Sequence, residues 1–230
     1  MATIASRLQQ VRLRIARACA AAGRPIEDVT LLAVSKTCSA ASVREAHAAG
    51  QTCFGENYVQ EALAKIEQLA ELRGATRWHL IGPLQSNKAR LVAEHFDWVH
   101  SVASVKLAER LSAQRPPHLA ALQVCLQVNI GAEASKSGLA PADVPAVAHA
   151  VARLPGLRLR GLMAIPEPAG DRQAQRAPHR ALRKLLQALQ RDGLALDTLS
   201  MGMSADLEAA IAEGATIVRV GTAIFGARAA

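Results

Sequence analysis

Short runs of β-branched and apolar residues alternate along the whole chain with Ala-rich stretches whose apolar positions recur at helical spacing. Each run has the length of a buried strand, and each following stretch has the length of a helix. The predicted strands cover residues 29–35, 52–56, 77–82, 98–102, 122–130, 157–165, 198–204 and 216–221. The predicted helices cover residues 42–50, 59–72, 87–95, 105–114, 143–154, 179–193, 206–214 and 222–230.

Eight repeated strand–helix units predict an α/β fold, because such units place strands parallel and eight of them close into a barrel. We expect one domain over residues 1–230, a single (β/α)8 TIM barrel. An additional N-terminal helix is expected over 3–23, where apolar residues recur on one face. An open doubly wound sheet is the alternative, but no GxGxxG motif follows the first strand. Residues 166–178, rich in Pro, Gly and charge, should be the least ordered stretch.

Charge and composition restrict the function. The net charge of +8 would suit a nucleic-acid binder, but the arginines are spread along the chain and only 3% of residues are aromatic. We therefore expect no nucleic acid, and we expect the charge to attract anionic ligands. Four scattered cysteines without a CxxC pair indicate neither disulfides nor a metal site, and suggest the cytoplasm. No apolar run reaches the ~18 residues of a membrane span.

The first predicted strand ends in a lysine, although lysine is rarely buried. By the period of two along a strand, Leu32, Val34 and Lys36 share one face. The first two are expected to point into the barrel, so the Lys36 amine should lie at the C-terminal mouth, where barrel active sites form. A desolvated amine there suits Schiff-base chemistry with a carbonyl. A lysine that only extends into solvent is the alternative.

The last two units have a pattern typical of phosphate binding. Gly202 and Ser204 lie between the seventh strand and its helix, and Gly221 and Thr222 lie at the next strand-to-helix junction. Barrels commonly bind phosphate with backbone N–H groups in these two loops, and hydroxyl groups add donors. Two ordinary capped helices are the alternative for either loop alone.

A mouth lysine opposite two phosphate-binding loops indicates either a phosphosugar aldolase or a pyridoxal 5'-phosphate (PLP) site. Arg219 bears on this choice because Ile217, Arg219 and Gly221 alternate onto one face of the eighth strand. An inward Arg219 could donate a hydrogen bond to an unprotonated pyridine nitrogen.

Seven motifs resemble, in order and spacing, the pyridoxal phosphate homeostasis protein family: LLAVSKT, FGENYVQE, WHLIGPLQSNK, SKSGL, GLMAI, LSMGMSADLEAAI and RVGTAIFG. The resemblance covers roughly residues 5–228 and implies a fold similar to the barrel domain of alanine racemase. In that family the lysine that ends the first strand forms the internal aldimine with PLP, which falls on Lys36. The resemblance further implies phosphate donors, an arginine facing the pyridine nitrogen and two residues lining the cofactor. These positions fall on Ser204, Gly221, Thr222, Arg219, Asn57 and Met163.

Five other residues are weaker candidates. His79, near the mouth, either lines the pocket or is a hydrogen-bonded core histidine. Asn87 and Lys88 are expected in a loop or helix start, with ligand contact as the alternative. Lys136 either receives or relays cofactor or is a solvated loop lysine. We expect Cys38 to be a packing residue, since no base for it can be identified.

Binding is favoured over turnover. An arginine at the pyridine nitrogen weakens the ring as an electron sink, and the tyrosine base that alanine racemases take from a second domain has no counterpart, since the single tyrosine, Tyr58, adjoins the GEN motif. We expect a cytoplasmic, monomeric PLP carrier or buffer, acting in vitamin B6 and amino-acid homeostasis, with PLP and PLP-dependent apoenzymes as partners. A weak PLP-dependent amino-acid racemase or isomerase using Lys36 as base is the alternative. A cofactor-free aldolase is a third class.

Overall fold

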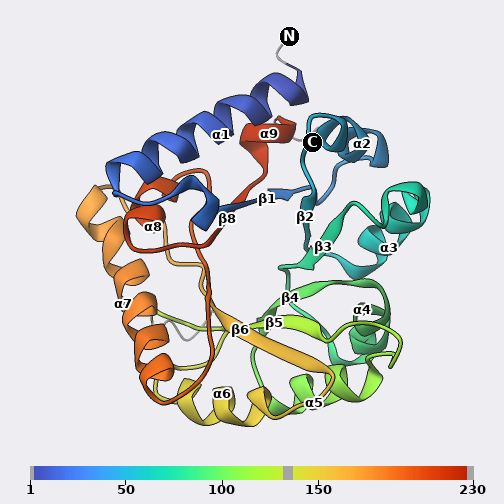
Figure 1. Ribbon diagram of the computed structural model, residues 1–230, viewed down its shortest axis with the longest axis vertical. Coiled ribbons are helices and arrows are strands. Elements are labelled where there is room, and N and C mark those ends of the chain that lie inside the picture. Colours follow the sequence, from blue (N-terminus) through green and yellow to red (C-terminus); the bar gives the residue numbers. More distant parts are fainter. Residues whose placement is uncertain (1–2, 132–136, 227–230) are drawn as a thin grey trace.

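The computed structural model describes residues 3–131 and 137–226. Eight parallel strands form a closed barrel in chain order, and β8 (Ile217–Val220) pairs back onto β1 (Thr30–Val34) (Figure 1). The intervening strands are β2 (Cys53–Glu56), β3 (Arg77–Leu80), β4 (Trp98–Val102), β5 (Leu122–Gln127), β6 (Leu157–Met163) and β7 (Thr198–Ser200). The predicted (β/α)8 barrel is confirmed.

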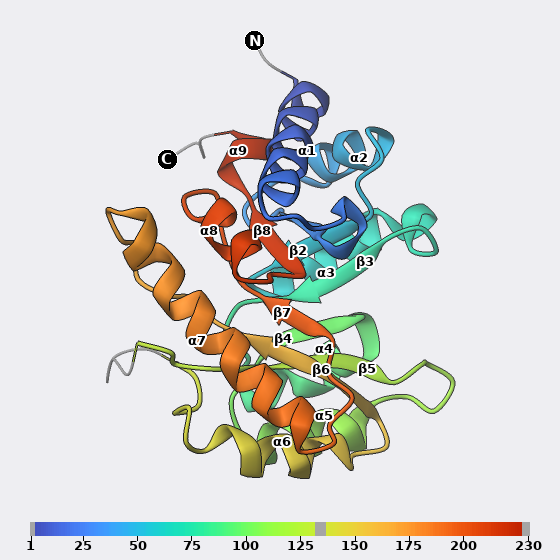
Figure 2. The same cartoon turned by 60° about the vertical axis from the view of Figure 1, so that its left-hand side comes forward.

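Helices surround the barrel and cover the outer faces of the strands (Figures 1 and 2). They are α1 (Ile4–Ala21), α2 (Ala40–Ala48), α3 (Val59–Gln68), α4 (Ala89–His95), α5 (Val105–Gln114), α6 (Val144–Ala152), α7 (Arg172–Arg191), α8 (Leu207–Ala212) and α9 (Thr222–Phe225). Short 3-10 turns are η1 (Ile26–Asp28), η2 (Ala70–Leu72) and η3 (Ser86–Lys88). The N-terminal α1 packs on α2, α8 and α9 through a buried face that includes Leu8, Val11 and Ile15.

The seventh and third helices show the differences from the sequence-based expectation that matter most. The seventh helix starts at Arg172 rather than at residue 179, because the Asp171 side chain caps it by accepting the Ala174 N–H at 2.8 Å. Pro178 lies within this helix. The helix expected over 59–72 is divided, since α3 ends at Gln68 and the turn η2 follows it. A local cap, rather than the apolar period, decides where the seventh helix begins.

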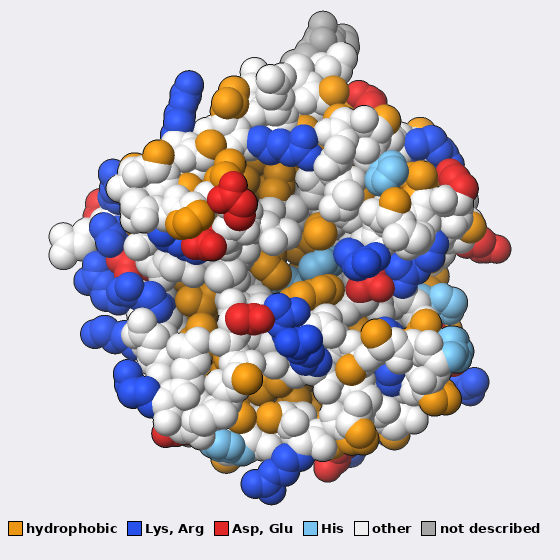
Figure 3. Space-filling model, in the orientation of Figure 1, with side chains coloured by type: hydrophobic (Ala, Val, Ile, Leu, Met, Phe, Trp, Pro, Cys, Tyr) orange, Lys and Arg blue, Asp and Glu red, His pale blue; other side chains and the backbone are white. Residues whose placement is uncertain are grey.

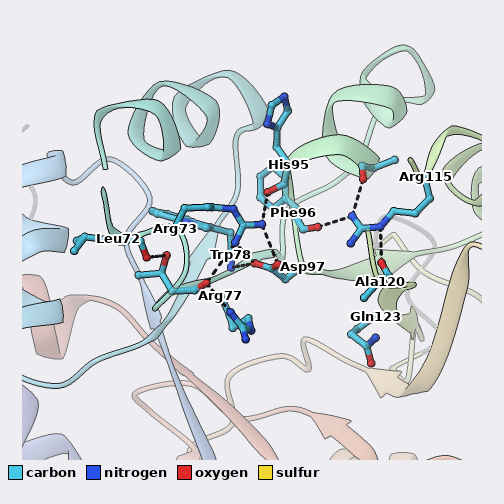
Figure 4. Close-up of polar contacts among 12 residues, drawn as sticks. Leu72, Arg73, Arg77, Trp78, His95, Phe96, Asp97, Arg115, Ala120 and Gln123 are labelled. Atoms are coloured by element: carbon cyan, nitrogen blue, oxygen red, sulfur yellow. Dashed lines mark hydrogen bonds and ion pairs between the residues drawn. The ribbon is translucent and has the colours of Figure 1, made fainter. Parts of the chain in front are cut away.

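Several arginines cross-link the loops around the starts of β3 and β4 (Figure 4). Arg73 donates to both carboxylate oxygens of Asp97 at 3.0 and 3.1 Å, and Asp97 also accepts the Trp78 N–H at 2.8 Å. Arg115 donates to three backbone carbonyls at 2.6–2.9 Å. Figure 3 shows Lys and Arg side chains spread over the visible face and interspersed with acidic ones. Part of the positive charge therefore serves the fold.

Among the residues that the structure describes, no helix is long and apolar enough to cross a membrane. The His, Cys, Asp and Glu side chains of the same residues form no group of three or more that could hold a metal ion.

Candidate cofactor-binding site

A cavity of about 320 Å³ opens at the C-terminal ends of the strands. Its size is at the lower end of the range for small-molecule sites. The lining residues are supplied by the ends of β1 and β8 and by the segments just after β1, β2, β3, β6, β7 and β8: Val34, Lys36, Asn57, Ile81, Ile165, Met203, Ser204, Ala205, Arg219, Gly221 and Thr222. The structure thus brings six of the seven predicted site residues to one cavity. The seventh, Met163, is fully buried at the end of β6 and is not among the lining residues.

The inward direction of Lys36 follows from the pleat of β1. Leu32 lies opposite Arg219 in the ladder between β1 and β8, and Val34 and Arg219 line the same cavity as Lys36. The intervening Ser35 is fully buried on the other side of the strand, where it bonds to Glu56. Alternation along an extended chain therefore carries the half-buried Lys36 to the barrel mouth, as the sequence predicted.

The loops after β7 and β8 form a group of donors on the cavity wall. The backbone N–H groups of Ser204, Ala205 and Thr222, which line the cavity, and of the next residue, Ala223, donate to no acceptor within the described residues. Ser204 and Thr222 also carry hydroxyl groups. Such a set of donors matches the oxygens of a phosphate group.

The conformation of Gly202 and the hydrogen bonds of Asp206 hold the loop after β7 in place. Gly202 has φ +90°, which only glycine adopts readily, and a Cβ there would lie 2.5 Å from the Ala210 side chain. Asp206 accepts the Met203 N–H at 2.7 Å and bonds to His179 Nε2 at 2.9 Å. Burial alone would raise the pKa of Asp206, but these hydrogen bonds together lower it. Asp206 is therefore ionised at neutral pH and closes the turn.

Arg14 holds the same loop from outside the barrel. From α1 it donates to the Ser204 carbonyl at 2.7 Å and forms a two-pronged ion pair with Glu208 at the start of α8. The sequence predicts α1 only as a helix with one apolar face, because an arginine on a helix surface carries no signal of its distant partner. The N-terminal helix thus contributes to the shape of the loop after β7.

Arg219 is almost fully buried and is fixed by backbone and hydroxyl oxygens. Its Nη1 donates to the Ser200 carbonyl at 2.6 Å and to the Ser200 hydroxyl at 2.9 Å, and its Nη2 donates to the Ala164 carbonyl at 2.9 Å. Burial lowers the pKa of Arg219 to about 10, against the opposing charge of Asp206. The side chain is still a cation at neutral pH, and its Nε makes no hydrogen bond to a described residue.

A buried chain of hydrogen bonds extends from Arg219 across the barrel. Ser200 Oγ lies 2.7 Å from His100 Nδ1, and His100 Nε2 lies 2.9 Å from His79 Nδ1. Burial lowers the pKa of His79 to about 3 and that of His100 well below its usual range, so both rings are neutral at pH 7. Ser200 Oγ accepts from Arg219, and its hydrogen can point to His100 Nδ1. In the tautomer that matches this arrangement, His100 Nε2 donates to His79 Nδ1, and each dipole stabilises the arginine's charge.

The structure decides some of the weaker candidates. His79 is the hydrogen-bonded core histidine of the two alternatives, stacked on Trp98 with ring centroids 5.3 Å apart. Asn87 and Lys88 lie in the turn η3 and are not among the residues that line the cavity. Lys136 lies outside the described residues. Cys38 is half-buried, and its Sγ contacts the Lys36 carbonyl at 3.7 Å.

Sequence reasoning missed the groups that bond to Arg219 and to the residues on either side of Lys36. Ser200 and His100 are inward-facing polar residues on strands, and this exception to apolar alternation is the signal that could have drawn attention to them. Glu56, Glu61 and Lys65 form an ionic cluster behind Lys36, as described below. Two of these three belong to the quoted FGENYVQE motif, in which only the asparagine was given a role.

Comparisons with known proteins agree with this fold. The model of the alanine racemase N-terminal domain matches residues 7–229, so the chain is a barrel protein of the alanine racemase N-terminal type. The pyridoxal phosphate homeostasis protein of Pseudomonas aeruginosa is 63% identical over 228 residues, covering 99% of this chain and 97% of that protein. Its Escherichia coli K12 counterpart is 54% identical over 230 residues, covering 99% and 98%. The chain belongs to the pyridoxal phosphate homeostasis protein family.

A solved structure of a related protein contains the cofactor. PipY of Synechococcus elongatus, with PLP bound, superposes with a TM-score of 0.85 at 42% identity, covering 97% of this chain and 100% of that one. The structure of PipY without PLP superposes with a TM-score of 0.87. The barrel architecture is therefore shared with a protein that binds PLP.

Proposed function

We propose that this protein binds PLP at the barrel mouth through Lys36 and serves as a carrier or buffer that keeps the free aldehyde at low concentration. One observation supports this most: Lys36, Arg219 and the donor groups of two phosphate-binding loops line a single cavity. The site fits PLP chemically, since it supplies an amine for the aldehyde, a donor for the ring and N–H groups for the phosphate.

PLP contributes an aldehyde, which condenses with a primary amine to give a Schiff base and water. The chain's own residues bring the reacting groups together. Lys36 supplies the amine, while Ser204, Gly221 and Thr222 bind the phosphate and set the distance between phosphate and amine. The apolar side chains Val34 and Ile81 limit water around the ring.

Arg219 is proposed to donate from Nε to the pyridine nitrogen. A cation at this position opposes protonation of the ring, which weakens its capacity to stabilise a carbanion. A site that keeps the ring in this state is suited to holding PLP rather than to transforming amino acids. Asn57 is proposed to contact the ring from the segment after β2, and Met163 to support that region from beneath.

A second cavity of about 340 Å³ adjoins the first and shares Asn57, Ile81 and Ile165 with it. It offers room for an amino acid, which keeps the weak racemase or isomerase as a second candidate function. Two-base racemisation needs an acid–base group on each face of the substrate. Apart from Lys36 and Arg219, the described residues that line the two cavities carry no ionisable side chain, and Tyr58 is 58% exposed outside both. This supports the carrier.

Borohydride reduction tests the attachment site. Reduction of the PLP-loaded protein should fix the cofactor on the peptide that contains Lys36, and Lys36→Ala should lose the visible absorption of the bound cofactor. Lys106→Ala, which removes an exposed lysine of α5, is the matched control and should behave like the unmodified protein. Labelling mainly at another lysine would contradict the assignment.

Exchange of the amino-acid α-proton in deuterated water distinguishes carrier from enzyme. Followed by NMR over a panel of amino acids, exchange with loaded protein should not exceed that with free PLP. Exchange well above that rate, and absent in Lys36→Ala, would establish racemase-like turnover instead.

The setting in the cell is part of the proposal. We infer a cytoplasmic protein that acts as a monomer and transfers PLP to PLP-dependent apoenzymes. Support comes from the named role of the family in PLP homeostasis and from a barrel that is closed without a second chain. Analytical ultracentrifugation checks the monomer, and reactivation of an apo-aminotransferase by loaded protein checks transfer.

A further inference from the structure

A buried ionic cluster lies directly behind Lys36. Lys65 Nζ, from α3, donates to the Ser35 carbonyl at 2.6 Å and contacts the carboxylates of Glu56 and Glu61, each at 2.7 Å. Its three ammonium hydrogens are thereby matched by three oxygens. The Lys65 and Glu56 side chains are 6% and 0% exposed.

The cluster holds the chain on both sides of Lys36. Before it, Ser35 bonds through its carbonyl to Lys65 and through its hydroxyl to Glu56 at 2.6 Å. After it, the Thr37 N–H donates to Glu61 Oε1 at 2.5 Å. Because Ser35 and Lys36 alternate across the strand, the cluster occupies the helix side while Lys36 faces the cavity.

Thr37 shows that this backbone is held against its preference. It has φ +63°, the one left-handed non-glycine residue in the described chain. A β-branched residue disfavours this conformation by about tenfold in population. The Glu61 carboxylate accepts the Thr37 N–H in this conformation, so loss of that acceptor should release the turn and with it the direction of Lys36.

Stability alone does not account for the cluster. Burying ionised groups involves a large desolvation penalty, and apolar residues of similar volume commonly serve as well. Burial raises the pKa of Glu56 despite Lys65 beside it, which shows the same penalty. The three hydrogen bonds that leave the cluster for the strand end all go to Ser35 or Thr37, which points to positioning instead.

We propose that Glu56, Lys65 and Glu61 are positioning residues that fix the backbone of residues 35–37 and so direct the Lys36 amine at the aldehyde of PLP. This inference rests on the proposed function of Lys36. Among the described residues the cluster bonds to the chain on either side of Lys36 and not to its amine, so it acts through the strand end and the left-handed turn.

Glu61 is the residue to change, because its side chain is 29% exposed and its replacement is tolerated more readily than that of Lys65. Glu61→Ala should slow Schiff-base formation with PLP about tenfold in stopped-flow absorbance and should change the visible circular dichroism of the bound cofactor. Glu61→Gln retains an acceptor for the Thr37 N–H and should stay within about threefold of the unmodified rate.

The double variant Glu61→Ala/Thr37→Gly tests the turn itself, since glycine adopts the left-handed conformation freely. It should return the rate to within about threefold of the unmodified protein and restore the dichroism. Glu67→Ala, an exposed glutamate of the same helix, makes the same charge change away from the cluster and should alter neither readout.

Two results would overturn the inference: unchanged rate and dichroism in Glu61→Ala, or no recovery on adding Thr37→Gly. The borohydride experiment keeps these outcomes separate from the proposed function. Labelling of Lys36 together with either result rejects only the positioning role. Failure to label Lys36 in the unmodified protein rejects the site, and the positioning role with it.

Discussion

Replacing Arg219 with methionine separates the cost of a buried charge from its use at the cofactor. The arginine is 4% exposed, and the groups that contact it are carbonyls and a hydroxyl rather than a carboxylate. Methionine has a similar length and needs no hydrogen-bond partner. The variant therefore removes the charge and its donors while filling much of the same space.

The expected change in stability is small because two terms oppose each other. Burial lowers the pKa of Arg219 from its ordinary value to about 10, which corresponds to about 3 kcal/mol against the cation in the folded state. Loss of the arginine leaves the Ala164 carbonyl without this donor, at a cost of about 1–3 kcal/mol. The Ser200 carbonyl still accepts the Ala164 N–H, and the Ser200 hydroxyl keeps its contact with His100. The net change should stay within about 2 kcal/mol.

Urea unfolding of the cofactor-free protein measures the change in stability. Visible spectroscopy of the PLP-loaded protein measures the effect of Arg219 on the cofactor. We expect Arg219→Met to shift the absorption of bound PLP and its pH dependence, because the ring nitrogen loses its donor and becomes free to take a proton. Arg44→Met is the control, since Arg44 is an exposed arginine paired with Glu71 far from the cavity lining. Arg44→Met should leave both the free energy of unfolding and the absorption of bound PLP nearly unchanged.

The opposite pattern would refute the reasoning. A loss of more than about 4 kcal/mol in the free energy of unfolding, with an unchanged spectrum, would show that Arg219 serves the barrel core rather than the cofactor. A changed spectrum with near-native stability would show that this costly buried cation serves the ring.

Two further predictions concern the rim of the site. A Cβ at Gly82 would lie 2.3 Å from the Asn57 carbonyl oxygen. Gly82→Ala should therefore displace Asn57 and weaken PLP binding at least about tenfold in equilibrium dialysis. Gly74→Ala is the control and should leave binding unchanged, because a Cβ there meets no atom within 4 Å. Burial would raise the pKa of Asp206, but hydrogen bonds that include one from His179 lower it below 3.8. The ionised Asp206 therefore stabilises the folded protein fully above pH 3.8, and this stabilisation is lost as the pH falls through the pKa of the folded state. Asp206→Asn should therefore flatten the acid decline in urea-measured stability between about pH 5 and about pH 2.

Much of the molecule follows from local pattern. The eight strand–helix units, their closure into a barrel and the inward direction of Lys36 depend on periods of 2 and 3.6 residues, which are visible in one sequence. The sequence predicts the loops at Ser204 and Thr222 for the same reason, since glycine and hydroxyl residues at strand-to-helix junctions form a local pattern that needs no knowledge of distant contacts. Helix ends were less predictable, as at Arg172, because a single capping side chain decides them.

The sequence by itself determined the order of elements and the residues that meet at the mouth, because strand ends of a barrel converge wherever the chain places them. Tertiary structure decided which buried polar groups contact one another. His100 and Ser200 are 100 positions apart, and Lys65 meets Ser35 across 30. These contacts depend on strand register and on how α3 packs against the barrel. No residue period encodes that geometry; it arises only when the barrel closes.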